Sequence, residues 1–306
     1  MPTRQGSFRL FRFGGIDVYL HWSWFLVAYY EIFLRGIGHY ESPLWAVLEY
    51  LSLFLIVMMH EFGHALACRS VGGDANQIVL WPLGGVAYVA PPPRPGATLW
   101  TIAAGPLVNV ILVPILFAAG IAAQKTGLIA DHPDLRTFIR SLLTIDIGLL
   151  IFNLLPVYPL DGGQILRSLL WFPFGRARSL LVSSVVGMVG VIALFIYALL
   201  GESIWMGIVC LFLLVQCWTG LTRARSMARI ADAPRRDGAA CPWCRAAPPR
   251  GEFWTCPRCK HSFDMFSSGG VCPICNTQFG GTSCFECGRS SALKDWLPPP
   301  SAPINN

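Results

Sequence analysis

Long apolar runs separated by short polar stretches occupy the chain as far as Leu221. A helix needs about 20 mostly apolar residues to cross the hydrocarbon core of a bilayer. Six stretches approach this length, and we expect each to span a membrane: Ile16–Leu34, Leu44–Cys68, Leu99–Ala123, Ser141–Pro156, Leu180–Leu200 and Ile204–Leu221. The pattern therefore predicts an all-α polytopic membrane domain with about six helices over residues 16–222, after a short cytoplasmic segment, residues 1–15.

One apolar stretch does not fit a spanning helix. Residues 76–90, NQIVLWPLGGVAYVA, are too few and too interrupted, and their β-branched residues flank a turn-like Pro82-Leu83-Gly84-Gly85. We expect a β-hairpin that dips into the membrane. Non-helical backbone is tolerated at that depth only where protein covers it or where it lines a wet cavity.

The composition changes along the chain. Only 13% of the 306 residues are charged, whereas soluble domains carry roughly 25%. Residues 223–306, however, hold 11 of the 23 Lys and Arg, 6 of the 17 Asp and Glu, and eight of the eleven Cys. We therefore expect a membrane domain followed by a small, basic, cysteine-rich soluble domain.

The Lys and Arg residues in the short flanks of the expected spans predict the orientation, because such residues concentrate on the cytoplasmic side. One side collects Arg4, Arg9, Arg12, Arg69, Arg94, Arg167, Arg176, Arg178, Arg223, Arg225, Arg229, Arg235 and Arg236. The other side has only Arg35, Lys125, Arg136 and Arg140. We expect a multi-pass protein of a prokaryotic plasma membrane with both termini in the cytoplasm.

The second expected span carries the sequence His60-Glu61-Phe62-Gly63-His64. Residues four apart lie on one face of a helix, so the two imidazoles can bind one Zn²⁺ ion while Glu61 lies beside it as a general base. Ionisable groups inside a membrane span are costly and point to function. The alternative is a pair of buried histidines hydrogen-bonded to neighbouring helices.

A catalytic zinc ion needs a third protein ligand and an open position. Asp161 lies about as many residues after the start of its own expected span as His60 does after the start of its span. Both residues should therefore reach a similar depth in the membrane. Pro156 and Pro159 interrupt the helix before Asp161, and Gly162-Gly163 after it free the backbone. Asp161 is therefore the expected third ligand. The alternative is that Asp161 caps the helix that follows.

The C-terminal region contains four Cys-x-x-Cys pairs. Such spacing is typical of zinc sites, and we expect two Cys₄ sites rather than disulfides in a reducing compartment. Pairing in sequence order would place Cys241, Cys244, Cys256 and Cys259 on one ion, and Cys272, Cys275, Cys284 and Cys287 on the other. The pattern resembles a small, β-rich tandem zinc ribbon over residues 241–288, after a linker, residues 223–240, and before a disordered tail, residues 289–306.

Four motifs together resemble the site-2 protease family of intramembrane zinc metalloproteases: HEFGHAL, PLGGVA, AAGPLVNV at Ala103–Val110, and NLLPVYPLDGGQILR. The resemblance covers about residues 10–220. It implies that His60, His64 and Asp161 bind the catalytic zinc ion and that Glu61 is the catalytic glutamate. It also implies roles in catalysis or substrate binding for Asn153, and in substrate binding for Asn109, Gly84 and Gly85. Both asparagines could instead form hydrogen bonds between helices.

The expected function is that of an intramembrane zinc endopeptidase that cleaves a transmembrane segment of other membrane proteins, with one catalytic and two structural zinc ions. A helical substrate must unwind before attack, and strand pairing with residues 78–89 would hold it extended. The expected partners are a transmembrane substrate, the lipid bilayer and a cytoplasmic protein at the zinc ribbons. Nucleic acid is a less favoured partner of the ribbons.

Two other classes of function remain open. One is a membrane-anchored zinc-ribbon regulator on an inactive protease scaffold, against which the complete set of ligands and base argues. The other is a metal transporter, which would need ionisable residues along several helices. In this sequence, most polar groups of the spans converge on one depth.

Overall fold

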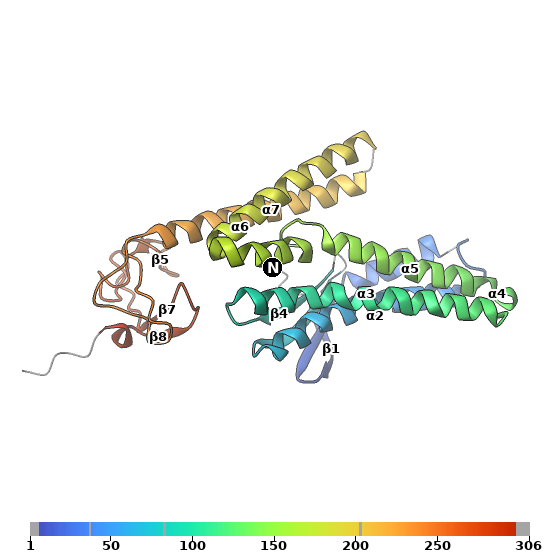
Figure 1. Cartoon of the computed structure of the whole chain (residues 1–306), viewed down its shortest axis with the longest axis horizontal. Coiled ribbons are helices and arrows are strands. Elements are labelled where there is room, and N and C mark those ends of the chain that lie inside the picture. The colour runs from blue at the N-terminus through green and yellow to red at the C-terminus, as the bar shows by residue number, and fades with distance from the viewer. Residues whose placement is uncertain (1–5, 37, 82–83, 202–203, 298–306) are drawn as a thin grey trace, which may run out of the picture. The chain divides into compact units, whose positions relative to one another are not determined.

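The computed structural model describes residues 6–36, 38–81, 84–201 and 204–297 (Figure 1). The chain divides into two compact units, Met1–Leu221 and Thr222–Asn306. The first unit contains a sheet and the long apolar helices, and the second contains the cysteine pairs.

A four-stranded sheet forms in the first unit, in the order β1-β2-β3-β4. Its strands are β1 (Ser7–Phe13), β2 (Ile16–His21), β3 (Asp74–Trp81) and β4 (Gly84–Ala90). Strands β3 and β4 are antiparallel, so the expected hairpin is confirmed. Strand β2 pairs in parallel with β3 and antiparallel with β1. In this order, β1 and β4 are the edge strands of the sheet.

The prediction of a spanning helix over Ile16–Leu34 is wrong. Its first six residues, IDVYLH, alternate between buried and half-buried positions, which is the period of a strand with one covered face. The remainder forms only the short helix α1 (Trp24–Tyr29) and the π-helical turn η1 (Tyr30–Arg35). The buried side of β2 packs with β3 and with the second expected span, through Ile16, Val18, Ile78, Leu80 and Val57.

The remaining elements of the first unit are helical. They are α2 (Pro43–Ser70), α3 (Pro95–Lys125), α4 (Leu128–Asp131), α5 (Pro133–Leu154), α6 (Asp161–Leu200) and the start of α7 (Ile204–Asp232). Among the described residues, α2, α3, α5 and α6 are long and apolar enough to cross a membrane. The sixth expected span, residues 204–221, lies in α7.

Local sequence explains where these helices begin and bend. Pro43, Pro95 and Pro133 each stand in the first turn of a helix, where the missing N–H is not needed. Helix α6 consists of two segments, because Gly175 has φ 76° and ψ 173°, outside the helical region, two residues after Pro173. The expected span over residues 180–200 is the second segment.

Helix α3 is central to the bundle. It packs against α2, α5 and α6, and Figure 1 shows α2, α3 and α5 running side by side. The approach to α2 is close at Gly63, where an added Cβ would lie 2.7 Å from the carbonyl oxygen of Ala104. This contact brings the polar residues of α2 and α3 to one level.

The second unit is small and β-rich. It contains the hairpins β5–β6 (Trp254–Thr255, Ser262–Phe263) and β7–β8 (Gly281–Ser283, Ser290–Ala292), followed by the 3₁₀ turn η2 (Leu293–Trp296). The prediction of disorder from residue 289 onward places the start of the tail too early, because β8 pairs with β7 and Trp296 is buried. The rest of that tail, residues 298–306, lies outside the described residues.

The expected linker, residues 223–240, is also largely structured. Helix α7 continues to Asp232, and Pro234 accepts a backbone hydrogen bond from Arg250 at 2.8 Å. The N–H of Ala240 donates to the carbonyl oxygen of Trp296 at 2.8 Å. These bonds join both ends of the second unit, so residues 234–240 belong to its fold.

Candidate metal centre and active site

The structure brings His60, His64 and Asp161 together. The Nε2 atoms of His60 and His64 lie 3.0 and 3.3 Å from Oδ2 of Asp161, and 3.2 Å from each other. Tetrahedral zinc with bonds of about 2.0–2.1 Å to nitrogen and oxygen holds its ligand atoms about 3.3 Å apart. The three atoms therefore have the spacing of three corners of a zinc site, with the fourth left for water or substrate.

The chain between α5 and α6 aims Asp161. It leaves the helical conformation at Leu155 and resumes it at Asp161, the first residue of α6. An added Cβ on Gly162 or Gly163 would lie 2.2–2.4 Å from backbone atoms of Leu154 or Val157, so only glycine allows this turn to pack so closely. No side chain caps α6 at Leu160, and the carboxylate of Asp161 faces the histidines.

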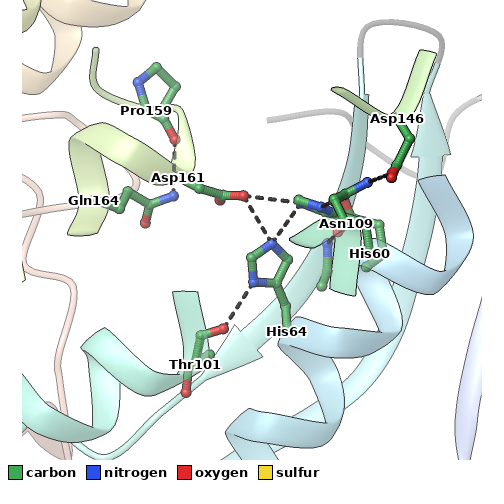
Figure 2. A network of polar contacts seen from close by, with 10 residues as sticks. His60, His64, Thr101, Asn109, Asp146, Pro159, Asp161 and Gln164 are labelled. Carbon is green, nitrogen blue, oxygen red and sulfur yellow. Dashed lines mark hydrogen bonds and ion pairs between the residues drawn. The ribbon is translucent and has the colours of Figure 1, made fainter. Parts of the chain in front are cut away.

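The far side of each imidazole is hydrogen-bonded to an acceptor. Nδ1 of His60 lies 2.6 Å from Oδ1 of Asn109, and Nδ1 of His64 lies 2.9 Å from the carbonyl oxygen of Thr101 (Figure 2). Since an acceptor faces each Nδ1, the proton resides there, and each Nε2 keeps its lone pair for a metal. Sequence reasoning missed Thr101, because its contribution is a backbone carbonyl, which any residue supplies.

Asn109, expected to bind substrate, is hydrogen-bonded inside the bundle. Its side chain is fully buried on α3, and both ends of its amide are engaged. Oδ1 faces His60, and Nδ2 donates to Oδ1 of Asp146 at 2.6 Å (Figure 2). Asn109 therefore holds the imidazole of His60 from behind, and its own side chain has no exposed surface.

Glu61 lies next to His60 in the chain but outside the group of three residues that could hold a metal ion. It is 5% exposed, and its Oε2 accepts a hydrogen bond from the N–H of Ala87 on β4 at 2.8 Å. An added Cβ on Gly85 would lie 2.2–2.5 Å from three atoms of the Glu61 side chain. Gly85, expected to contact substrate, thus provides the space that Glu61 occupies. Gly84 pairs with Trp81 at the turn end of the hairpin.

Two other residues bear on the site. Gly105 of α3 was not selected from the sequence, yet an added Cβ there would lie 2.3 Å from Nε2 of His64 and 2.8 Å from Nε2 of His60. Asn153 is half-buried in the last turn of α5. Its role in catalysis stays a prediction.

The eight cysteines form two groups, but the predicted sequential pairing is wrong. Cys241 and Cys244 meet Cys284 and Cys287, with sulfur–sulfur distances of 3.7 Å, while Cys256 and Cys259 meet Cys272 and Cys275, with distances of 3.5 Å. Four sulfurs on tetrahedral zinc lie about 3.8 Å apart, whereas a disulfide bond is about 2.05 Å long. Both groups therefore fit Cys₄ zinc sites in a nested arrangement.

Each Cys-x-x-Cys pair forms the same tight turn. The residue after the second cysteine donates its N–H to the first cysteine's carbonyl oxygen and has a positive φ, at Arg245, Lys260, Asn276 and Gly288. The nesting follows from the fold of the unit, because the bond from Ala240 to Trp296 brings the first and last turns together. A buried cluster that includes Trp254, Phe263 and Met265 packs around the inner pairs.

The nested arrangement makes a prediction about zinc content. Replacing Cys284 and Cys287 by serine is expected to release one zinc ion per chain and to expose Cys244 and Cys241 to alkylation, because these four thiols share one site. Cys256 and Cys259 should stay protected. Zinc content and mass spectrometry of alkylated peptides measure both effects. Exposure of Cys272 and Cys275 with protection of Cys241 would restore sequential pairing.

The fold and the site define a class of protein: a polytopic helical protein whose apolar helices enclose two histidines and an aspartate suited to a metal ion. The signature of Peptidase family M50 matches residues 49–134 and 121–197. The solved structure of the site-2 protease from Methanocaldococcus jannaschii matches with a TM-score of 0.50 and 31% identity, over 70% of this chain and 95% of that one. The chain belongs to this family, the site-2 proteases, and is a membrane protein.

Curated proteins that are similar in sequence to this chain include zinc metalloproteases. Zinc metalloprotease MJ0392 of Methanocaldococcus jannaschii is 35% identical over 207 residues, which are 67% of this chain and 58% of the relative. Stage IV sporulation protein FB of Bacillus subtilis is 34% identical over 134 residues, 42% of this chain and 43% of that protein. The chain thus spans about half the length of the curated relatives it matches.

Proposed function

We propose that this protein is an intramembrane zinc endopeptidase that hydrolyses a peptide bond in a transmembrane segment of another membrane protein. The observation that carries the proposal is the spacing of 3.0–3.3 Å among His60, His64 and Asp161, with Glu61 beside them and outside the ligand group. These residues lie on α2 and α6, which are long and apolar enough to cross a membrane. The names of the relatives support the same reaction.

The residues of the site have separate roles in hydrolysis. His60, His64 and Asp161 would hold a zinc ion, which would supply the Lewis acid that lowers the pKa of water and polarises a scissile carbonyl. Glu61 takes the proton of the attacking water and later delivers it to the leaving amine. The N–H of Ala87 holds the carboxylate of Glu61 in place, and Asn109 and the carbonyl of Thr101 hold the imidazoles.

Strand β4 is the element that presents a substrate. It lies at the edge of the sheet, and its Ala87 N–H points away from β3 toward Glu61. A substrate that adds to this edge as a further strand would be extended beside the catalytic glutamate. Extension is needed because a helical peptide bond is hydrogen-bonded and shielded.

This route makes a prediction about substrates. In a reconstituted cleavage assay with the full chain, a transmembrane peptide with Asn, Gly or Pro near the scissile bond should be cut faster than a matched all-Leu peptide, because helix interruption lowers the free energy of unwinding by about 1–3 kcal/mol at each Gly or Pro. Product formation by mass spectrometry measures the rate. Equal rates for both peptides would contradict unwinding before attack, and no cleavage of either peptide by the zinc-loaded protein would contradict the proposed function.

We further propose three zinc ions per chain, one at the catalytic ligands and two in the cysteine unit, since each group has the ligand spacing of zinc. The organisms of the relatives, Methanocaldococcus jannaschii and Bacillus subtilis, support a prokaryotic plasma membrane. The Arg residues at the end of α7 (Arg223, Arg225 and Arg229) and the two that follow it (Arg235 and Arg236) support a cytoplasmic position for the second unit. On that side, residues 241–297 form a closed, basic, zinc-stabilised unit suited to recognising the cytoplasmic part of a protein substrate. Cys₄ sites leave no position for water, so this unit binds and takes no part in the chemistry.

A further inference from the structure

One buried carboxylate in the membrane domain has no part in the mechanism above. Asp146 lies on α5, fully buried, in a helix apolar enough to cross a membrane. A charged group in such a place is costly and calls for a functional reason. Its Oδ1 accepts the hydrogen bond from Asn109, and its Oδ2 is buried without a hydrogen-bond partner among the described residues.

The chemistry of the Asn109 amide supplies the reason. One end of an amide only accepts hydrogen bonds and the other only donates them, and the two ends exchange places when the side chain rotates by half a turn. A carboxylate accepts. The NH₂ end of Asn109 must therefore face Asp146, and the carbonyl end must face Nδ1 of His60 (Figure 2).

The direction of this amide decides which nitrogen of His60 can bind a metal. A carbonyl opposite Nδ1 requires the proton on Nδ1 and leaves the lone pair on Nε2, which faces Asp161 and His64. With the amide reversed, an NH₂ group would face Nδ1, and the favoured tautomer would carry its proton on Nε2. That tautomer cannot bind zinc through Nε2, the atom that faces the site.

His64 needs no such anchor. Its Nδ1 faces the backbone carbonyl of Thr101, which accepts in every arrangement. Of the two histidines, His60 alone depends on a side chain that could face either way. This asymmetry explains why a buried carboxylate stands behind one zinc ligand and not behind the other.

We propose that Asp146 is a positioning residue for the metal site: its carboxylate orients the amide of Asn109, which sets the tautomer of His60 and presents Nε2 to the metal. The proposal rests on the proposed zinc site but not on proteolysis. It couples α5, α3 and α2 through two hydrogen bonds of 2.6 Å. Asp146 touches no substrate, so its effect should fall on metal binding and on kcat, with KM unchanged.

The test is a pair of variants of the full chain. Asp146→Asn keeps the size of the side chain but lets either end of it face Asn109, so zinc affinity at the His–Asp site should fall about 10- to 100-fold, as for other partners of zinc-binding histidines. The double variant Asn109→Asp with Asp146→Asn should restore most of the affinity. In that variant the new carboxylate at position 109 accepts from His60, and the new amide at position 146 donates to that carboxylate.

Competition with a chelator measures the affinity, and the two Cys₄ sites in the same chain serve as an internal reference that should not change. Thr144→Val is the matched control, since Thr144 is exposed on the same helix and bonds only to the carbonyl of Arg140 among the described residues. It should keep wild-type affinity. Unchanged affinity in Asp146→Asn, or a folded double variant no better than the single one, would overturn the proposal. Absence of cleavage in the wild type would instead overturn the proposed function and leave this measurement intact.

Discussion

Glu61→Gln is expected to lower the rate of peptide cleavage by at least about 10²- to 10⁴-fold, the range of a general base, while zinc content stays at the wild-type level. Glutamine keeps the size of the side chain, and its carbonyl oxygen can still accept the hydrogen bond from Ala87. It cannot take a proton from water. Because Glu61 lies outside the ligand group, the metal should remain.

Asp161→Ala is the matched comparison, because it removes a ligand. Zinc at the His–Asp site should be lost together with activity, leaving only the zinc of the cysteine unit. Asp131→Ala, at an exposed acid of α4, is the control and should keep both. Metal analysis of the three purified variants measures the zinc content of each. Equal loss of zinc from Glu61→Gln and Asp161→Ala would contradict the assignment of Glu61 as a base.

Gly105→Ala is expected to abolish both zinc binding and cleavage at the catalytic site. The added methyl would lie 2.3 Å from Nε2 of His64 and 2.8 Å from Nε2 of His60, the two atoms that face the metal. Neither ring can turn away without breaking its bond to Thr101 or to Asn109.

The control for Gly105 is Gly96→Ala in the first turn of the same helix, where an added Cβ meets nothing within 4 Å. It should keep wild-type zinc content and activity. Circular dichroism and the zinc of the cysteine unit report whether each variant is folded. A folded Gly105→Ala protein with full zinc content would show that the close contact at Gly105 can relax.

The parts of the site that follow a local period could be predicted from the sequence. His60 and His64 share a helix face because they are four residues apart, and the hairpin follows from two β-branched runs around Pro82-Leu83-Gly84-Gly85. The strand Ile16–His21 was missed although IDVYLH alternates, because the apolar residues after it extend the run to the length of a span. The length of the apolar run favoured a membrane-spanning helix over the strand that the alternation of residues 16–21 indicates.

Other features depend on contacts between distant segments. Thr101 contributes a carbonyl group, and Gly105 contributes the absence of a side chain, so neither has a sequence signature. The direction of the Asn109 side chain follows from its two neighbours on other helices. The nested cysteine groups follow from the closure between Ala240 and Trp296, which spacing alone does not reveal.

The two borders of the four-stranded sheet are chemically unlike. Strand β1 carries Arg9 and Arg12, both paired with Asp17, and charged side chains of this kind discourage a foreign strand from joining. Strand β4, GGVAYVA, has no charged residue. The β4 border is therefore the uncharged one of the two, and its Ala87 already bonds to Glu61. Under the proposed function, we expect a substrate to join the sheet at β4, beside Glu61, and not at β1.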